Sequence, residues 1–555
     1  MRKLIYLFCV AVLAASMMSC IRIKIPKKGG GVSVSVPVED VSATVSAFTT
    51  ASVPLTAEDN LNTVEEHVVH GRYAEAINEL RKWREIGELE AKDVVLYDIQ
   101  MAMLLHLNGE FKKSNQLLDH AERRMDDLFT KSLTTEASSY VTNDNTLPYE
   151  GEDFEKVMVN IIGALNYVFL QQWNEALVEM RKVDHKLNVY SDQYKKKASY
   201  RLTEKSLQYL QPQISPDSAS AKWKKLKDRR FPTQDDFLDA AKEAIGDELK
   251  EPMRSTVLNL AEESVYREDA FARYLSGVLY EALGEENDAF IAYRKAYQTF
   301  QTYQKDYDTL VPSRLKRDLL RVTKKLGLMT EYQEYRNAFP AIDEIPANAL
   351  NAQGELVFLS YNDLSPVKVQ HTVRIPVPVG TRLHLMKIAF PRFAVRTNKV
   401  AYAEIQLKSA QGKKINQQTF EVENIGAIAI KDLDDRIGRI RTKAIARATA
   451  KFVAVKSAEK GAKQALGVFG GFAAGTAGNT VANISERIDK RSWRLLPGKI
   501  QMGRLFASPG VYHLEVQYYS KNKELLGSRN YPDIRVDAGK KTFVRARFFS
   551  GAGTN

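Results

Sequence analysis

The feature that most constrains this chain is a short turn signature that occurs four times between residues 71 and 290. Each copy has a turn or polar residue first, an aromatic residue two positions later except in the last copy, and a small residue three positions after that. The copies begin at Gly71, Gly109, Gln171 and Gly284. Each one follows a segment of apolar helical periodicity and precedes another, which predicts pairs of antiparallel helices.

The residue types of the signature suit such a helix pair. Glycine permits the left-handed turn, the aromatic residue packs beneath it, and the small residue lets the helices approach closely. The predicted structural residues are Gly71, Tyr73, Ala76, Gly109, Phe111, Trp173, Ala176, Gly284 and Ala289. The unit resembles the tetratricopeptide repeat (TPR), whose period is about 34 residues. The alternative is an unrelated helical bundle.

The pattern changes after Pro340 and Pro346, where short segments of alternating polarity replace the helical period. The predicted strands are 355–361, 367–379, 382–389, 401–407, 511–518, 534–536 and 542–549. Turn residues recur about every ten positions, which is typical of a sandwich or barrel. We therefore predict an α+β multidomain chain: a TPR-like domain over residues 56–345 and a β-rich, sandwich- or barrel-like domain over 346–555.

A helical hairpin is predicted as an insertion in the β-rich domain, over residues 426–490. Its first half is basic, and the stretch from Gln464 to Ser485 carries no charge. Gly467, Gly471 and Gly475 recur every four residues and would form a flat ridge that lets another backbone come close. Two interpretations stay open: close contact with the β-rich domain or a second copy in a homo-oligomer, or contact with a bilayer.

The N-terminus has the pattern of an export signal, with Arg2 and Lys3 before an apolar run that is too short to span a membrane. Residues 17–20 end in Cys20 and resemble the lipobox of bacterial lipoproteins, in which the cysteine is acylated. We predict a signal peptide over 1–19 and a lipidated, flexible tether over 20–55. Ile21, rather than aspartate, after the cysteine predicts an outer-membrane location, facing the periplasm.

Charge and cysteine content narrow the classes of partner. The formal charge is +12, from 80 basic and 68 acidic residues, and removal of 1–19 would leave 12 − 2 = +10. This modest excess, together with the export signal, argues against nucleic acid as a partner. Cys9 and Cys20 are the two cysteines, so no disulfide or zinc framework is expected in the mature chain.

No motif in the sequence predicts catalysis, a metal site or a cofactor. His67 and His70 lack the spacing of a zinc protease, and Thr476 follows Gly470–Gly475 where a phosphate loop needs lysine. The acidic cluster at 150–155 reads as helix-start charge, with a cation site as the alternative. Trp493, flanked by Arg491 and Arg494, is predicted to be a core or interface anchor, with glycan binding as the alternative.

Two stretches, with the lipobox, resemble an uncharacterised family of bacterial TPR lipoproteins. The first is Tyr149–Glu155, continuing through 163–167 and 176–181; the second is Arg491–Pro497, continuing to 509–512. The resemblance implies no enzymatic activity. We predict a membrane-anchored envelope lipoprotein that is a scaffold or adaptor for envelope proteins. The alternatives are a self-assembling structural component of the envelope and an enzyme that acts on the cell wall.

Overall fold

Helices that are joined by tight turns make up the N-terminal half of the described chain. The computed structural model describes residues 57–134, 147–197, 268–379, 382–434, 440 and 488–551, and residues 61–555 belong to one compact unit. The helices are α3 (Ala57–Val69), α4 (Tyr73–Glu85), α5 (Val94–Asn108), α6 (Phe111–Thr134), α7 (Asp153–Phe169), α8 (Trp173–Lys197), α13 (Ala270–Ala282), α14 (Glu286–Tyr307), α15 (Ser313–Leu326), α16 (Met329–Ala338) and the short α17 (Ala349–Ala352), with a 3-10 turn η1 (Ala91–Asp93).

The turns between paired helices carry the signature residues. Gly71, Gly109 and Gly284 have φ of 70°, 85° and 77°, which is the left-handed region that glycine occupies without steric cost. Gln171 adopts the same conformation at φ 60° in the third turn. A fifth turn at Gly327, with φ 70°, joins α15 to α16.

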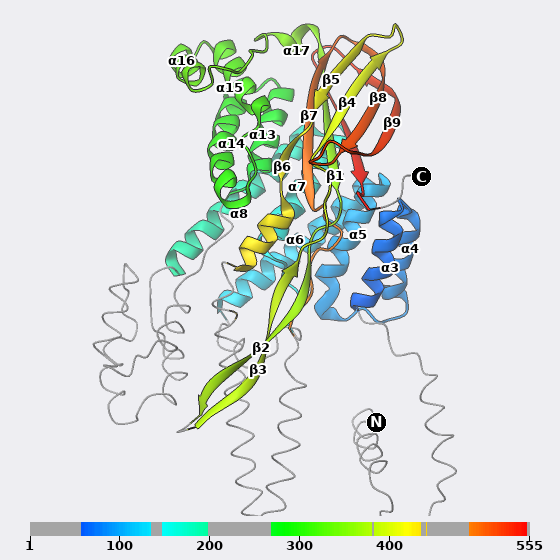
Figure 1. The fold of residues 1–555 in the computed structure, drawn as a ribbon, viewed down its shortest axis with the longest axis vertical. Helices are drawn as coiled ribbons and strands as arrows, with labels where there is room; N and C mark the ends of the chain where they lie inside the picture. Colours follow the sequence, from blue (N-terminus) through cyan, green and yellow to red (C-terminus); the bar gives the residue numbers. More distant parts are fainter. Residues whose placement is uncertain are drawn as a thin grey trace, which may run out of the picture. The chain divides into compact units, whose positions relative to one another are not determined.

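The strands begin directly after α17. They are β1 (Gly354–Asn362), β2 (Val367–Val379), β3 (Arg382–Ala394), β4 (Tyr402–Ser409), β5 (Lys414–Gln418), β6 (Phe420–Glu423), β7 (Lys499–Ala507), β8 (Gly510–Tyr519), β9 (Leu525–Val536) and β10 (Lys541–Phe548). One sheet has the order β10-β1-β7-β6, with β1 parallel to β10 and the other pairs antiparallel. The second sheet, β5-β4-β8-β9, is antiparallel, and β2 and β3 form a separate hairpin (Figure 1).

The two four-stranded sheets pack face to face around one apolar core. Leu356 and Phe358 of β1 contribute to it from the first sheet, and Ile405 and Leu514 contribute from the second. Gly503 is required at this interface, because a Cβ atom there would lie 2.5 Å from Cδ1 of Ile405. The prediction of an α+β chain is confirmed, and the β-rich part is an open sandwich: among the described residues neither sheet closes into a barrel.

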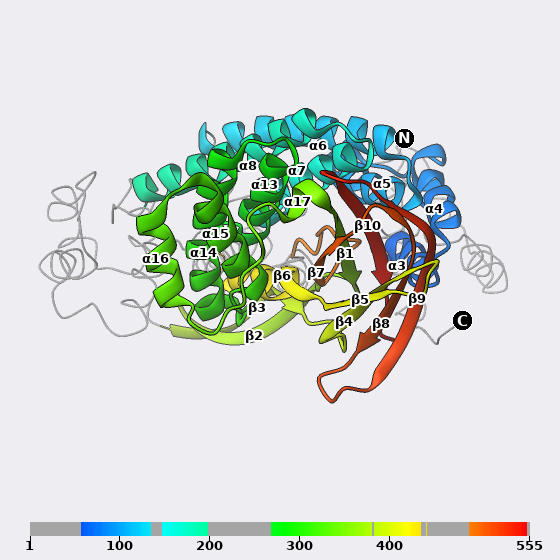
Figure 2. The same ribbon diagram turned by 90° about the horizontal axis from the view of Figure 1, so that it is seen from above.

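Strand β1 is buried along its whole length because it has a neighbour on each face. Leu356 and Phe358 lie in the sandwich core, whereas Glu355 and Tyr361 contact side chains of the helices. Figure 2 shows the reason: the helices run in a curved row, and the strands lie on its inner side. The sheet therefore fills the inner side of the helical row, and both parts of the fold share a buried boundary.

Three strands, β5, β6 and β7, were not predicted. In β7, Gly503 and Arg504 interrupt the apolar pattern by which a strand is recognised. Gly503 lies against Ile405 in the sandwich core, and Arg504 forms buried ion pairs with acidic side chains of the helices and of β1. Of the predicted helical insertion, residues 426–434 are helical, whereas residues 488–490 have no regular secondary structure. The glycine ridge at 467, 471 and 475, the signal peptide, Cys20 and the tether up to 55 lie outside the described residues.

Candidate functional site: the inner face of the helix pairs

A segment of the chain that is neither helix nor strand lies on the inner face of the helix pairs. We call residues Arg491–Pro497 the docked segment. Its first residues have no regular secondary structure, and contacts with helices almost four hundred positions earlier in the sequence hold it in place. This is the tryptophan motif that the sequence singles out as an interface.

Gln100 of α5 binds the backbone of the docked segment in two places. Its Nε2 donates to the carbonyl oxygen of Ser492 at 2.9 Å, and its Oε1 accepts from the amide of Leu495 at 3.1 Å. Gln100 is fully buried. A side-chain amide carries a donor and an acceptor together, so it can satisfy a peptide backbone without regard to that peptide's side chains.

Glu155 of α7 makes a second backbone contact. Its Oε1 accepts from the amide of Trp493 at 2.6 Å, and its Oε2 accepts from the backbone amide of Glu152 at 3.0 Å and from the Tyr149 hydroxyl. Burial, followed by the nearby Glu152 carboxylate, raises the pKa of Glu155. The indole of Trp493 is 1% exposed, so the segment is anchored by a large apolar group between its polar contacts.

Two arginines fix the docked segment on either side of the indole. Arg491 pairs with Asp93 at 3.0 Å and lies 5.3 Å from the ring centre of Tyr149. Arg494 pairs with Glu65 of α3 at 2.6 Å. Arg491, Trp493 and Arg494, which the sequence suggests as interface residues, are therefore brought together in a contact within the chain.

A second polar contact joins α13 and α15 to the sandwich. We call it the charge cluster, and its members are Glu281, Arg314, Asp318, Arg321, Glu355, Arg504 and Lys541. Arg504 of β7 lies at its centre, 2.6 Å from Asp318, 2.8 Å from Glu355 and 3.2 Å from Glu281. The Arg504 side chain has no exposed surface.

The other basic members of the charge cluster complete the pairing. Lys541 of β10 bonds to Glu281 at 2.8 Å and also to Glu355, and Arg314 bonds to Glu355 at 2.6 Å. Burial by itself would raise the pKa of Glu355, but the surrounding Arg504, Lys541 and Arg314 outweigh it and lower that pKa. Glu355 thus stays ionised through several charge-assisted hydrogen bonds.

A third contact centres on His106 of α5. Its Nδ1 lies 2.6 Å from Oδ1 of Asn166 in α7, and its Nε2 lies 3.2 Å from the Tyr361 hydroxyl in β1. Burial, with a smaller effect from Arg545, lowers the pKa of His106 to about 3. The imidazole is therefore neutral at pH 7, and it joins two helix pairs to the sheet by hydrogen bonds.

The predicted turn residues lie at the helix starts and between the paired helices. Tyr73, Phe111 and Trp173 are the first residues of α4, α6 and α8. Ala76, Ala176 and Ala289 are fully buried. Phe111 also reaches the sandwich, because the Arg545 guanidinium lies 5.3 Å from its ring centre and 5.5 Å from that of Phe169.

Most residues of the docked and charged contacts were missed from sequence alone. The missing signal was a polar residue within a mostly apolar helical run: Gln100 and His106 both lie in the run 94–107. A polar side chain at such a position is buried and needs a partner. That signal identifies the residues, although it does not identify their partners.

Neither a metal cluster nor a membrane-crossing helix is found among the described residues. No protein-family model matches the chain, and comparison with the curated proteins gives no match. One similar solved structure is the TPR2AB-domain:pHSP90 complex of yeast Sti1, with 14% identity and a TM-score of 0.16 over 51% of this chain and 88% of that one. The evidence for TPR-like pairing of the helices therefore comes from the turns and contacts of this chain.

Proposed function

We propose that this protein is a scaffold for protein–protein interaction that is anchored in a bacterial envelope by an acylated Cys20, and that it belongs with the TPR lipoproteins that its sequence resembles. The observation that carries this proposal is the docked segment. Helix pairs whose inner face holds the backbone of a polypeptide segment through Gln100 and Glu155 have the chemistry that polypeptide recognition needs. Catalysis has no part in this function.

The anchor is proposed from the N-terminal sequence. A signal peptide that ends at Ser19 would expose the Cys20 amine and thiol for acylation, and more than one acyl chain gives stable membrane attachment. The residue after the cysteine supports an outer-membrane position that faces the periplasm. Envelope proteins are then the partners within reach, because the tether and lipid hold the helices near the membrane.

Partners would bind to faces that the docked segment leaves open. Two exposed apolar residues mark such faces on the second helices of their pairs: Val178 of α8 is 47% exposed and Ile291 of α14 is 41% exposed. Val511 of β8, at 55% exposed, marks the sandwich. Photo-reactive residues at these three positions distinguish the helical faces from the sandwich as the partner surface.

The first test is cross-linking in living cells, comparing the wild type with Cys20→Ala. We expect a set of envelope proteins to be recovered with the wild type, from positions 178 and 291 in preference to 511, and to be lost or reduced in Cys20→Ala. Cys9→Ala is the matched control, because residue 9 lies in the segment that would be removed. Incorporation of an alkyne-tagged palmitate should be abolished by Cys20→Ala alone.

Two results would contradict the proposal. If tagged palmitate labels Cys20→Ala as strongly as the wild type, the anchor is wrong. If copies of this chain are the only proteins recovered, the scaffold role is wrong, and a self-assembling envelope component replaces it.

A further inference from the structure

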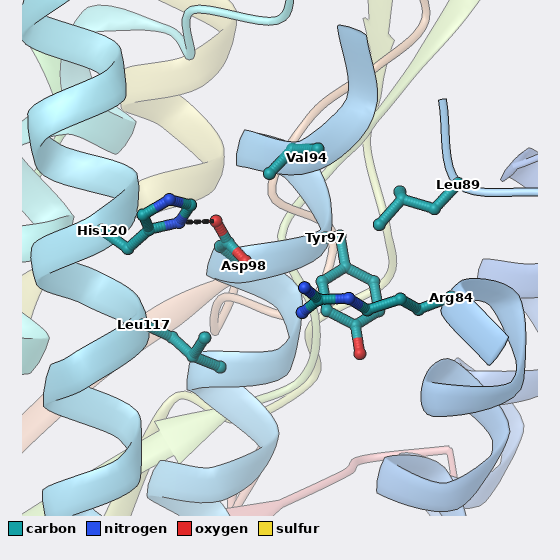
Figure 3. A pocket seen from close by; sticks show the side chains of 7 residues that line it. All are labelled: Arg84, Leu89, Val94, Tyr97, Asp98, Leu117 and His120. Atoms are coloured by element: carbon teal, nitrogen blue, oxygen red, sulfur yellow. Dashed lines mark hydrogen bonds and ion pairs between the residues drawn. The ribbon is translucent and has the colours of Figure 1, made fainter. Parts of the chain in front are cut away.

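A cavity of about 400 Å³ opens between α4, α5 and α6, away from the docked segment and the charge cluster. Its walls are mostly apolar, formed by Leu89, Val94, Leu117 and the ring of Tyr97, and the charged side chains at it are Arg84, Asp98 and His120 (Figure 3). A volume of about 300–1,000 Å³ with apolar walls and a few polar groups is typical of a small-molecule site.

The polar groups at this cavity are arranged for a negative charge. Arg84 reaches across the Tyr97 ring, with its guanidinium carbon 5.9 Å from the ring centre (Figure 3). Among the described residues Arg84 forms no ion pair. A guanidinium held over an aromatic face keeps several N–H groups free to bind an anion in a bidentate manner.

His120 supplies a second donor beside Arg84. Its Nδ1 lies 2.6 Å from Oδ2 of Asp98, whose side chain is 3% exposed, whereas the His120 side chain is 48% exposed. Burial raises the pKa of Asp98, and His120 and Arg84 act in the opposite direction. Asp98 thus holds the imidazole in one orientation, and the other ring nitrogen points away from Asp98 (Figure 3).

We propose that this cavity binds a small organic anion, in which an apolar chain or ring carries one carboxylate or phosphate group. The apolar part lies against Leu89, Val94 and Leu117, and the charged group is bound between Arg84 and His120. Neither the membrane anchor nor the docked segment takes part, so this site is independent of the function proposed above.

The test is isothermal titration of the purified chain with three six-carbon probes: hexanoate, hexyl phosphate and 1-hexanol. We expect one or both anions to bind at least about tenfold more tightly than the alcohol, since a charge-assisted hydrogen bond is roughly twice as strong as a neutral one. The anion that binds more tightly identifies the charged group, carboxylate or phosphate, that the cavity prefers. Equal binding of the alcohol, or no binding of either anion, overturns the proposal.

Variants locate the binding in this cavity. Arg84→Gln should weaken the preferred anion about tenfold, and His120→Gln should weaken it less, because glutamine keeps a donor for Asp98. Leu117→Trp should block all three probes by filling the space. Lys82→Gln is the matched control, since Lys82 is an exposed cation on the same helix outside the cavity. Anion binding that survives both Arg84→Gln and Leu117→Trp would place it elsewhere and overturn the proposal.

Discussion

The helices meet the sandwich through two contacts of opposite chemistry. The docked segment is held mainly through its backbone, by the neutral Gln100 amide and the Glu155 carboxylate, and by one buried indole, with ion pairs on either side. The charge cluster consists of three carboxylates and four basic groups. The first contact recognises a peptide backbone, and the second places fixed charges of opposite sign next to one another.

This difference determines how each contact responds to change. A neutral hydrogen bond is worth about 1 kcal/mol, and a lost one is replaced in part by water or small adjustments. A buried ion without its partner retains its full desolvation cost, which is several kcal/mol. We therefore expect a single substitution in the docked segment to cause a moderate loss in the free energy of unfolding. Removal of one member of the charge cluster should cause a larger loss.

The largest effect is expected from Arg504→Met. It leaves Glu281, Asp318 and Glu355 buried with one positive charge fewer, and should lower the free energy of unfolding by about 5 kcal/mol. Urea denaturation followed by circular dichroism measures this loss. If the variant does not fold, Arg504→Lys, which keeps the charge and loses the forked geometry, should give an intermediate loss. A loss below about 1 kcal/mol for Arg504→Met would remove the distinction between the two contacts.

Trp493→Ala should come next, because the indole is buried. We expect a loss of about 3–4 kcal/mol by the same denaturation measurement, from lost apolar burial and the cavity that remains. Trp493→Phe is the matched variant and should lose about 1–2 kcal/mol, since most of the aromatic volume is kept. Equal losses in the two variants would show that the indole does not anchor the segment.

Gln100→Met tests the backbone-directed hydrogen bonds alone. Methionine has nearly the same shape but cannot bind the Ser492 carbonyl or the Leu495 amide, so a loss of about 2 kcal/mol is expected. Amide hydrogen exchange at Leu495 should become faster in this variant, while exchange in β1 should be unchanged. Unchanged exchange at Leu495 would mean that Gln100 does not hold the segment.

His106 predicts how stability depends on pH at the boundary of the two parts. Its pKa is about 3 in the folded chain and 6.5 in a free imidazole, so between these values the unfolded chain binds the extra proton. Stability should therefore fall as the pH drops from about 6.5, by about 1 kcal/mol per pH unit from this group. Thermal unfolding of His106→Gln should show a shallower loss on acidification, with a constant offset above pH 7. Parallel curves for variant and wild type would contradict a buried, neutral imidazole.

The smallest effect is expected at an exposed ion pair. Arg535 and Asp537 lie 2.9 Å apart at the end of β9, with both side chains largely in water. Arg535→Gln should leave the denaturation midpoint unchanged within error, because solvent screens such pairs. A measurable loss would show that charge pairs stabilise this chain wherever they occur, and not by burial.

The sequence by itself determined the local structure. Helix periodicity, left-handed turns at Gly71, Gly109 and Gly284, and the alternation of β1, β2 and β8 depend on neighbours a few positions apart, so they can be read from a linear pattern. The sequence also marked Trp493 and its arginines as an unusual group. The anchor at Cys20 and the glycine ridge at 467–475 remain predictions, since they lie outside the described residues.

Only the tertiary structure decided which polar residues meet. Glu281, Asp318, Glu355, Arg504 and Lys541 come from two helices and three strands, and no local pattern relates positions that are up to 260 residues apart. The same holds for Gln100 and its partners in the docked segment. Burial makes each of these polar groups require a partner, but the partner's identity follows from the way the sheet enters the inner side of the helical row, which depends on contacts across the whole chain.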